Sequence, residues 1–528
     1  MVHLHLSNAQ QTALPSELNY LPMNSAPEGS TAQYSRVSTD SSQYQAGNII
    51  SIRIPGTGQL FDVDNSFLSV DCTLSGGGWA ATNTGISSFN QYSGINSIFS
   101  RVRLSAANGV TVIDSNVNYD YLMTVLNECL LDLGTAFHCV SSPVAKTSTT
   151  TIDNDNVGNN VVSNKVFSIP GQDLSMRYVQ GVEPFCACPA SFFTSHSGTV
   201  SNATEMMFNG DGKYDNTAGV CAALVLNPTQ SNTRTFVVNP LSIFFNHGSV
   251  LPLTCSYTLE LYLNTISTCT RVVQSSSTAL SLTSQSYSIA NVKYVMKTIK
   301  LPDEVRHKMD QVWKSSGLYV NLTNVQPYTG YNSSLAISND TIRINSYNKR
   351  SVTGFLLAPR LSSLPTIAEL DSYRRYHPDF QDITIKVGQN IADPIQSDAE
   401  CYRHTQNLFG GMELRNFADG QSNTYYSSER GYFVNYNLGT SQDRGAEWVL
   451  NTTANNRHKW FSSWCLGFDL KTFDTNEIAS GLSNQDLEIS YRLKSNPGTG
   501  TGAISWIVFL FYQSMLKLSY DGIAEIAS

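Results

Sequence analysis

The stretch Tyr257-Thr258-Leu259-Glu260-Leu261-Tyr262-Leu263 decides the fold class of this chain. Leucine occupies every second position, and the residues between the leucines are polar or amphipathic. Successive side chains of a β-strand point to opposite faces, so this alternation places all three leucines on one face. The stretch therefore predicts a strand with one face against a hydrophobic core.

Short apolar runs of the same kind lie on both sides of this stretch, separated by clusters of Gly, Asn, Asp and Ser. They are Ile49–Ile54, Ser66–Val70, Ile98–Leu104, Gly109–Ile113, Pro240–Phe245, Val250–Leu253, Tyr287–Val295, Thr341–Ile344, Val352–Leu357, Ile383–Val387 and Ile504–Leu518. Charged residues make up only 14% of the chain, whereas Tyr and Phe number 26 and 23. Aromatic residues and threonine are enriched in β-strands. The composition and the runs together predict an all-β protein.

Two turns, at Asn108-Gly109 and at Asn246-His247-Gly248, and two helices interrupt the strands. Asn108-Gly109 predicts a hairpin with a type I′ turn, because this dipeptide accepts the positive φ values that the turn requires. Asn118–Leu133 has apolar residues at helical spacing and is followed by Gly134, which favours the end of a helix. Pro302-Asp303-Glu304 predicts the start of a second helix, ending at Gly317.

The length of 528 residues exceeds what one hydrophobic core supports, since single cores stop growing at roughly 250–300 residues. Residues 1–46 lack sustained apolar periodicity and predict an extended N-terminal arm. The Ser/Thr-rich residues 274–286 mark the expected boundary, with a first unit over 47–274 and a second over 275–528. We predict two consecutive jelly-roll β-sandwiches with a few short helices in connecting loops. One sandwich joined to an unrelated β domain is the alternative.

The net charge of −8 argues against direct condensation of nucleic acid, which needs clustered Lys and Arg. The first 45 residues contain Glu17, Glu28 and Asp40 but only Arg36 as a base. We therefore expect no direct sequence-specific binding of nucleic acid. The beginning of the sequence turns polar after six residues, unlike a signal peptide, so we expect the protein not to be exported.

Few residues suggest a chemical site. Cys186 and Cys188 form a C-x-C pair, which we interpret as ordinary buried thiols, and His3, His5 and His247 form no metal-binding pattern. Asp62, Asp64 and Asn65 carry oxygen ligands but lack the glycine and distal glutamate of a calcium loop.

Phosphate and base recognition are also unsupported. Gly56-Thr57-Gly58 lacks the third glycine of a dinucleotide loop. Arg374 and Arg375, between Tyr373 and Tyr376, could stack on bases, but we interpret them as an inter-subunit contact. The run Trp506–Tyr512 predicts a buried strand. We therefore expect no catalytic, cofactor-binding or metal site, and no enzyme.

The order of segments from Pro240 onward resembles the double jelly-roll major capsid proteins of tailless icosahedral double-stranded DNA viruses, of the polinton, polinton-like virus and virophage type. Residues before 240 match by strand pattern only. The segments that carry the resemblance are Pro240–Phe245, Leu251–Leu253 and Leu259–Leu263 at the end of the first jelly roll, Ser288–Val292 and Asp303–Gly317 at the entry to the second, and Ile342–Asn345, Gly354–Leu357, Ile383–Gly388, Pro394-Ile395, Ser480–Leu482 and Ile504–Gly522 in its body.

This resemblance implies a homotrimer of pseudo-hexameric outline that tiles an icosahedral virion shell. Its partners would be itself, neighbouring trimers and minor capsid or penton proteins. The arm would lie beneath the trimer, against these neighbours or an inner membrane, and the shell would assemble inside the host cell. A glycan-binding or adhesion β-sandwich protein is the main alternative, and a β-sandwich hydrolase is the third.

Overall fold

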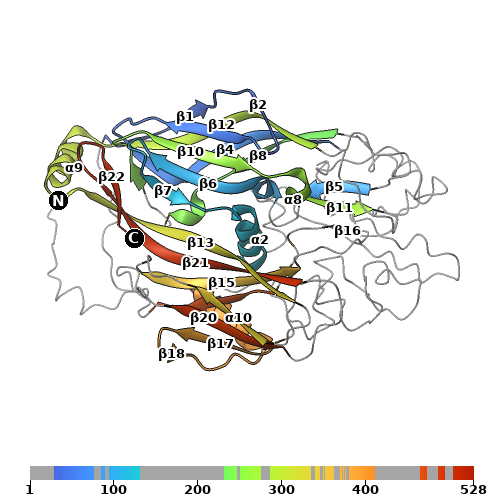
Figure 1. Cartoon of the computed structure of the whole chain (residues 1–528). Helices are drawn as coiled ribbons and strands as arrows, with labels where there is room; N and C mark the ends of the chain where they lie inside the picture. Colours follow the sequence, from blue (N-terminus) through green and yellow to red (C-terminus); the bar gives the residue numbers. More distant parts are fainter. Residues whose placement is uncertain are drawn as a thin grey trace, which may run out of the picture.

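The fold consists of two β-sandwiches stacked on each other (Figure 1). The computed structural model describes residues 29–75, 85–89, 94–130, 231–245, 250–274, 286–334, 339–344, 349, 351–361, 369–370, 373, 375, 380–410, 464–471, 486–493 and 503–527. The described strands form five sheets, and the strand pairings within them are antiparallel. The prediction of two jelly-roll sandwiches is confirmed in its fold class.

The first sandwich pairs a six-stranded sheet with a four-stranded sheet. The six-stranded sheet contains β1 (Thr31–Ser38), β2 (Gln43–Gln45), β4 (Leu60–Ser75), β8 (Ser231–Val238), β9 (Val250–Pro252) and β12 (Ser286–Lys300). The four-stranded sheet contains β3 (Ile49–Ile54), β6 (Phe99–Ala106), β7 (Thr111–Asp114) and β10 (Tyr257–Leu263). Every second residue of β10 is buried, as its sequence predicts.

The second sandwich has a five-stranded and a four-stranded sheet. The five-stranded sheet contains β13 (Leu318–Ser334), β15 (Val352–Leu361), β19 (Leu466–Asp469), β21 (Ala503–Leu518) and β22 (Ala524–Ala527). The four-stranded sheet contains β14 (Asn339–Ile344), β17 (Phe380–Val387), β18 (Asn390–Ile391) and β20 (Leu487–Leu493). A small fifth sheet joins β5 (Gly85–Phe89) and β11 (Thr270–Gln274) to β16 (Glu369–Leu370).

Strand β21 is buried on both faces because it lies between the two sandwiches. Trp506 and Val508 pack into the core of the second sandwich. Ile507 and Phe509 point the other way, into the core that fills the first sandwich. A strand covered on both faces needs a continuous apolar run. The prediction that Trp506–Tyr512 is a buried strand is thus confirmed, and this strand joins the two units.

Among the described residues, three helices have eight residues or more: α2 (Tyr119–Leu130), α9 (Asp303–Ser316) and α10 (Asp398–Leu408). Two of them confirm predicted helices, although the predicted end of the first at Gly134 lies outside the described residues. Helix α9 ends where predicted, because Gly317 adopts a φ of 77° that glycine accepts without a steric penalty. Short helical turns are η2 (Gly94–Ile98), η4 (Ser242–Phe244) and α8 (Ile266–Cys269).

The predicted hairpin between β6 and β7 is confirmed, but its turn is not type I′. Gly109 has a φ of 80°, whereas Asn108 is not among the residues with positive φ. Gly109 N donates to Ala106 O at 2.9 Å, and Ala106 N donates to Val110 O at 2.8 Å. This is a three-residue loop with glycine in the left-handed position, the G1-bulge hairpin. Only the glycine of the Asn-Gly pair is needed for its positive φ.

The predicted extent of the N-terminal arm and the predicted start of the second unit are both wrong. Both depend on which strands pair through their backbones, and the side-chain pattern does not reveal that pairing. Part of the predicted arm is the edge strand β1, whose eight residues pair with β12 from Thr31↔Lys300 to Ser38↔Lys293. Strand β12 itself pairs with β4 and fills the first core with Tyr287 and Tyr294. The second unit therefore does not start at residue 275, and the chain crosses to it after Lys300, through α9.

The predicted strand Pro240–Phe245 is wrong as well. Ser242–Phe244 form the turn η4, in which Phe244 N donates to Leu241 O at 3.1 Å. Leu241 and Phe244 nevertheless belong to the core, and Ile243 is partly buried against it. The predicted turn at Asn246–Gly248 lies outside the described residues.

Candidate functional site

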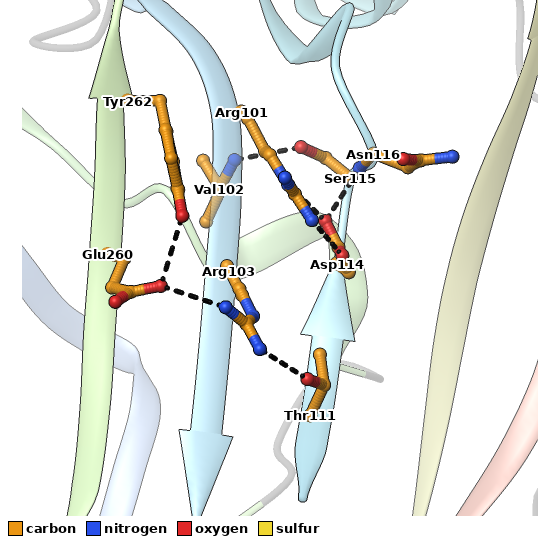
Figure 2. Close-up of polar contacts among 9 residues, drawn as sticks. All are labelled: Arg101, Val102, Arg103, Thr111, Asp114, Ser115, Asn116, Glu260 and Tyr262. Atoms are coloured by element: carbon orange, nitrogen blue, oxygen red, sulfur yellow. Dashed lines mark hydrogen bonds and ion pairs between the residues drawn. The ribbon is translucent and has the colours of Figure 1, made fainter. Parts of the chain in front are cut away.

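Four charged side chains form a ladder across the outer face of the four-stranded sheet of the first sandwich (Figure 2). We name Arg101, Arg103, Asp114 and Glu260 the outer ladder. Arg101 Nε donates to Asp114 Oδ1 at 2.7 Å and Arg101 Nη2 donates to Asp114 Oδ2 at 2.5 Å. Arg103 Nη1 donates to Glu260 Oε2 at 3.4 Å. The antiparallel register creates this ladder, since it places Glu260 directly opposite Arg103 and Arg103 opposite Asp114.

The outer ladder is half-buried, and its charges balance. Its side chains are 27–33% exposed. The hydrogen bond to Asp114 raises the pKa of Arg101, because the carboxylate stabilises the charged guanidinium. Two neighbours complete it: Arg103 Nη2 donates to Thr111 Oγ1 at 3.0 Å, and Tyr262 Oη donates to Glu260 Oε2 at 3.3 Å. Each carboxylate is paired with an arginine, so the ladder links three neighbouring strands at the surface and does not form a pair of catalytic carboxylates.

A second polar group, the junction cluster, ties the first sandwich to the segment between β16 and β17. It consists of Ser97, Asp120, Asn264, Tyr287 and Tyr373. Asp120 Oδ2 accepts hydrogen bonds from Asn264 Nδ2 at 2.7 Å and from Tyr373 Oη at 3.0 Å. Tyr373 Oη also lies 3.2 Å from Ser97 O, and Tyr287 Oη donates to Asn264 O at 2.5 Å. Each of these side chains is at least nine-tenths buried.

Burial gives Asp120 unusual electrostatics. Loss of water raises the pKa of its carboxyl to about 6, against the opposing effect of the hydrogen bonds from Tyr121 N, Tyr373 and Asn264. Sequence analysis did not single out Asp120. As a carboxylate in the first turn of a helix it resembles an ordinary N-terminal residue. No local pattern reveals a partner that lies 253 positions away.

The oxygen-rich residues near β4 are paired with protein groups. Asp62 Oδ2 accepts from Asn65 Nδ2 at 2.9 Å and lies 2.8 Å from Lys297 Nζ. Burial raises the pKa of Asp62, but the hydrogen bonds from Lys297 and Asn65 outweigh it and the net shift is downward. Within the described parts of the chain, no three His, Cys, Asp or Glu side chains lie close enough to hold a metal ion.

The interpretation of Arg375 as part of an inter-subunit contact is wrong, because its side chain and that of the flanking Tyr373 are buried inside one chain. Arg375 is 1% exposed, and its Nε donates to Trp464 O at 2.9 Å. Tyr373 is 3% exposed and belongs to the junction cluster. Neither ring nor guanidinium is available to bases or to a neighbour.

Several other residues singled out by the sequence lie outside the described ranges: Arg374, Tyr376, Cys186, Cys188, His3, His5 and His247. Gly56-Thr57-Gly58 connects β3 to β4. A Cβ on Gly56 would lie 2.9 Å from the carbonyl carbon of Cys255, which explains glycine there by close backbone approach. In the described segments, no helix is both long and apolar enough to span a bilayer.

Comparisons with known proteins rest on structure. No protein-family model and no curated protein sequence matches the chain. The mavirus major capsid protein superposes with a TM-score of 0.50 and 12% identity, over 100% of this chain and 95% of that one. The Faustovirus major capsid protein superposes with a TM-score of 0.49 and 9% identity, over 95% of this chain and 93% of that one. A chain of the Sputnik virophage structure superposes with a TM-score of 0.47 and 12% identity, over 97% of this chain and 92% of that one. The chain thus has the double jelly-roll fold found in the mavirus major capsid protein.

Proposed function

We propose that this chain is a structural major capsid protein whose homotrimers, pseudo-hexameric in outline, tile an icosahedral virion shell. The observation that carries the proposal is the likeness to the mavirus major capsid protein across both sandwiches and the entire chain. The likeness includes the arrangement of the two units and is not confined to one sandwich.

The rigid junction between the sandwiches supports this role. Strand β21 contributes to both cores, and the junction cluster adds buried hydrogen bonds between α2 and Tyr373. Two sandwiches joined through one shared strand and one continuous core would act as one block. Three such blocks around a threefold axis present six sandwiches at the rim, so one gene product can fill a hexagonal lattice.

The partners follow from the same proposal. The chain would contact itself within the trimer, neighbouring trimers within the shell, and minor capsid or penton proteins at its vertices. An inner membrane, where the virion has one, would lie beneath the shell. The assembled protein would be located in the virion capsid.

The test is the mass of the purified full-length chain in solution, measured by light scattering, with negative-stain images of the same sample. We expect a species of three times the chain mass with a hexagonal outline, or closed shells. Repeating the measurement at about 0.15 M and about 1 M salt separates a specific trimer from charge-driven aggregates. A folded monomer at both salt concentrations would overturn the trimer proposal and favour a β-sandwich binding protein.

A further inference from the structure

Two buried cysteines from different sandwiches meet at the junction. Cys129 lies in the last turn of α2, which packs on the first sandwich, and Cys465 directly precedes β19 of the second. Their Sγ atoms are 3.6 Å apart, although the residues are 336 positions apart in the chain. Both side chains are fully buried and belong to the core shared by the two sandwiches.

The backbones that carry these cysteines are held on both sides. Helix α2 is fixed at its start by the junction cluster through Asp120. The segment after Cys465 is fixed by the pairing of β19 with β15 and by a 2.8 Å hydrogen bond from Gly467 N to Thr405 Oγ1. The two thiols are therefore kept adjacent by the fold. A disulfide has an S–S length of about 2.05 Å, so the sulfurs need to approach by only about 1.5 Å.

We propose that Cys129 and Cys465 are an oxidisable pair that forms a disulfide linking the two sandwiches. With a peroxide as oxidant, one thiol is converted to a sulfenic acid and one water is released. The second thiol then attacks the sulfenic sulfur, the S–S bond forms and a second water leaves. Two thiols and one hydrogen peroxide thus give one disulfide and two waters. The inference does not depend on the proposed function.

Burial and redox compartment set the conditions for this step. Small reduced thiols of a reducing cytosol keep the pair as thiols, and an oxidising environment favours the disulfide. Since both sulfurs are fully buried, the oxidant reaches them only when the junction opens locally, so the reaction is slow. Once formed, the bond closes a long loop between the two sandwiches and stabilises the folded chain.

The experiment uses the purified full-length chain, incubated with hydrogen peroxide or with dithiothreitol, then denatured, alkylated and mapped by mass spectrometry. We expect a time-dependent cross-linked peptide joining Cys129 to Cys465, absent after dithiothreitol. The melting temperature of the oxidised chain should rise by several degrees, and reduction should reverse the rise. Cys129→Ala and Cys465→Ala should each abolish the cross-link, whereas Cys401→Ala, which removes a buried cysteine of α10, should leave it.

The peptide map of the unaltered chain decides the outcome even if a variant folds poorly. The proposal is overturned if both thiols remain fully alkylatable after exposure long enough to oxidise the chain's methionines. It is also overturned if either sulfur pairs with another cysteine or with a second chain in preference to its neighbour at 3.6 Å.

Discussion

Tyr373 Oη donates a hydrogen bond to Asp120 Oδ2 over 3.0 Å, although the two residues are 253 positions apart. Tyr373 comes from the second half of the chain, and Asp120 lies in the first turn of α2, the helix that packs beneath the first sandwich. A buried carboxyl thereby becomes part of the joint between the two units. Its protonation should affect the stability of the whole fold.

Stability should therefore depend on pH through Asp120. Its folded-state pKa of about 6 lies above the ordinary value of 3.8, so the folded state binds the proton more tightly. The stabilisation is complete below about pH 4 and is lost as pH rises through about 6, a difference of about 3 kcal/mol. Urea unfolding across this range should show the decline, and Asp120→Asn should flatten it. Asp340→Asn, which alters an exposed carboxyl of β14 in the second sandwich, is the matched control.

Removing the phenol should move the same transition. Tyr373→Phe deletes one of the hydrogen bonds that lowers the pKa of Asp120, so the decline should extend to higher pH. It should also cost about 1–2 kcal/mol, since a buried acceptor loses a partner. Asp120→Asn and Tyr373→Phe should be non-additive. Additive effects on the unfolding free energy would contradict a direct interaction.

Glycine at 354 should be indispensable for the packing of α10 on the five-stranded sheet. A Cβ there would clash with Leu408 Cδ1 and would lie 2.7 Å from Phe468 O, which is a backbone atom. Gly354→Ala should cost about 2–3 kcal/mol through overpacking. Gly410→Ala is the control, because its Cβ would meet open space and only its φ of 68° opposes the change. Thermal unfolding that ranks Gly410→Ala as the more harmful would refute this account.

Replacing Val117 with glycine should stabilise the fold. Its φ of 71° lies in the left-handed region, which a β-branched residue adopts only under strain, and its side chain is 49% exposed. Val117→Gly should stabilise the fold by about 1 kcal/mol. Val312, 57% exposed on α9, provides the contrast. Val312→Gly should destabilise the fold by several tenths of a kcal/mol, since glycine is a poor helix former. Equal signs for the two changes in chemical denaturation would count against the strain.

The outer ladder should contribute only modestly to the free energy of unfolding, and its contribution should depend on the salt concentration. A double-mutant cycle with Arg101→Gln and Asp114→Asn should give a coupling energy of about 0.5–1 kcal/mol, because the pair is half-buried but bidentate. The coupling should shrink at about 1 M salt. The asparagine keeps an acceptor for Asn116 N, which Asp114 Oδ1 now binds at 2.8 Å. A coupling that salt leaves unchanged would argue that the pair acts through packing.

The sequence pattern was enough to predict a strand or helix where one of its faces packs against a core. Leu259 and Leu261 mark β10 by alternation, and the region from Pro302 to Gly317 marks α9 by its terminal residues. Pattern failed at β1, where Thr31–Ser38 has no buried residue and is held by its backbone pairing with β12. It failed again at Arg375, because charge normally indicates exposure and this guanidinium is buried against Trp464 O.

By itself, the sequence determined the all-β fold class and the core-facing residues of the alternating strands, because side-chain alternation records burial at every second position. The length of the chain predicted two units. Only the tertiary structure decided which sheet each strand joins, where the chain crosses between units, and which distant groups meet at the junction. Strand β12 joins the first sandwich through backbone hydrogen bonds that every residue except proline can donate. Asp120 meets Tyr373, and Cys129 meets Cys465, because two cores share β21, and no local pattern encodes contacts made across so long a separation.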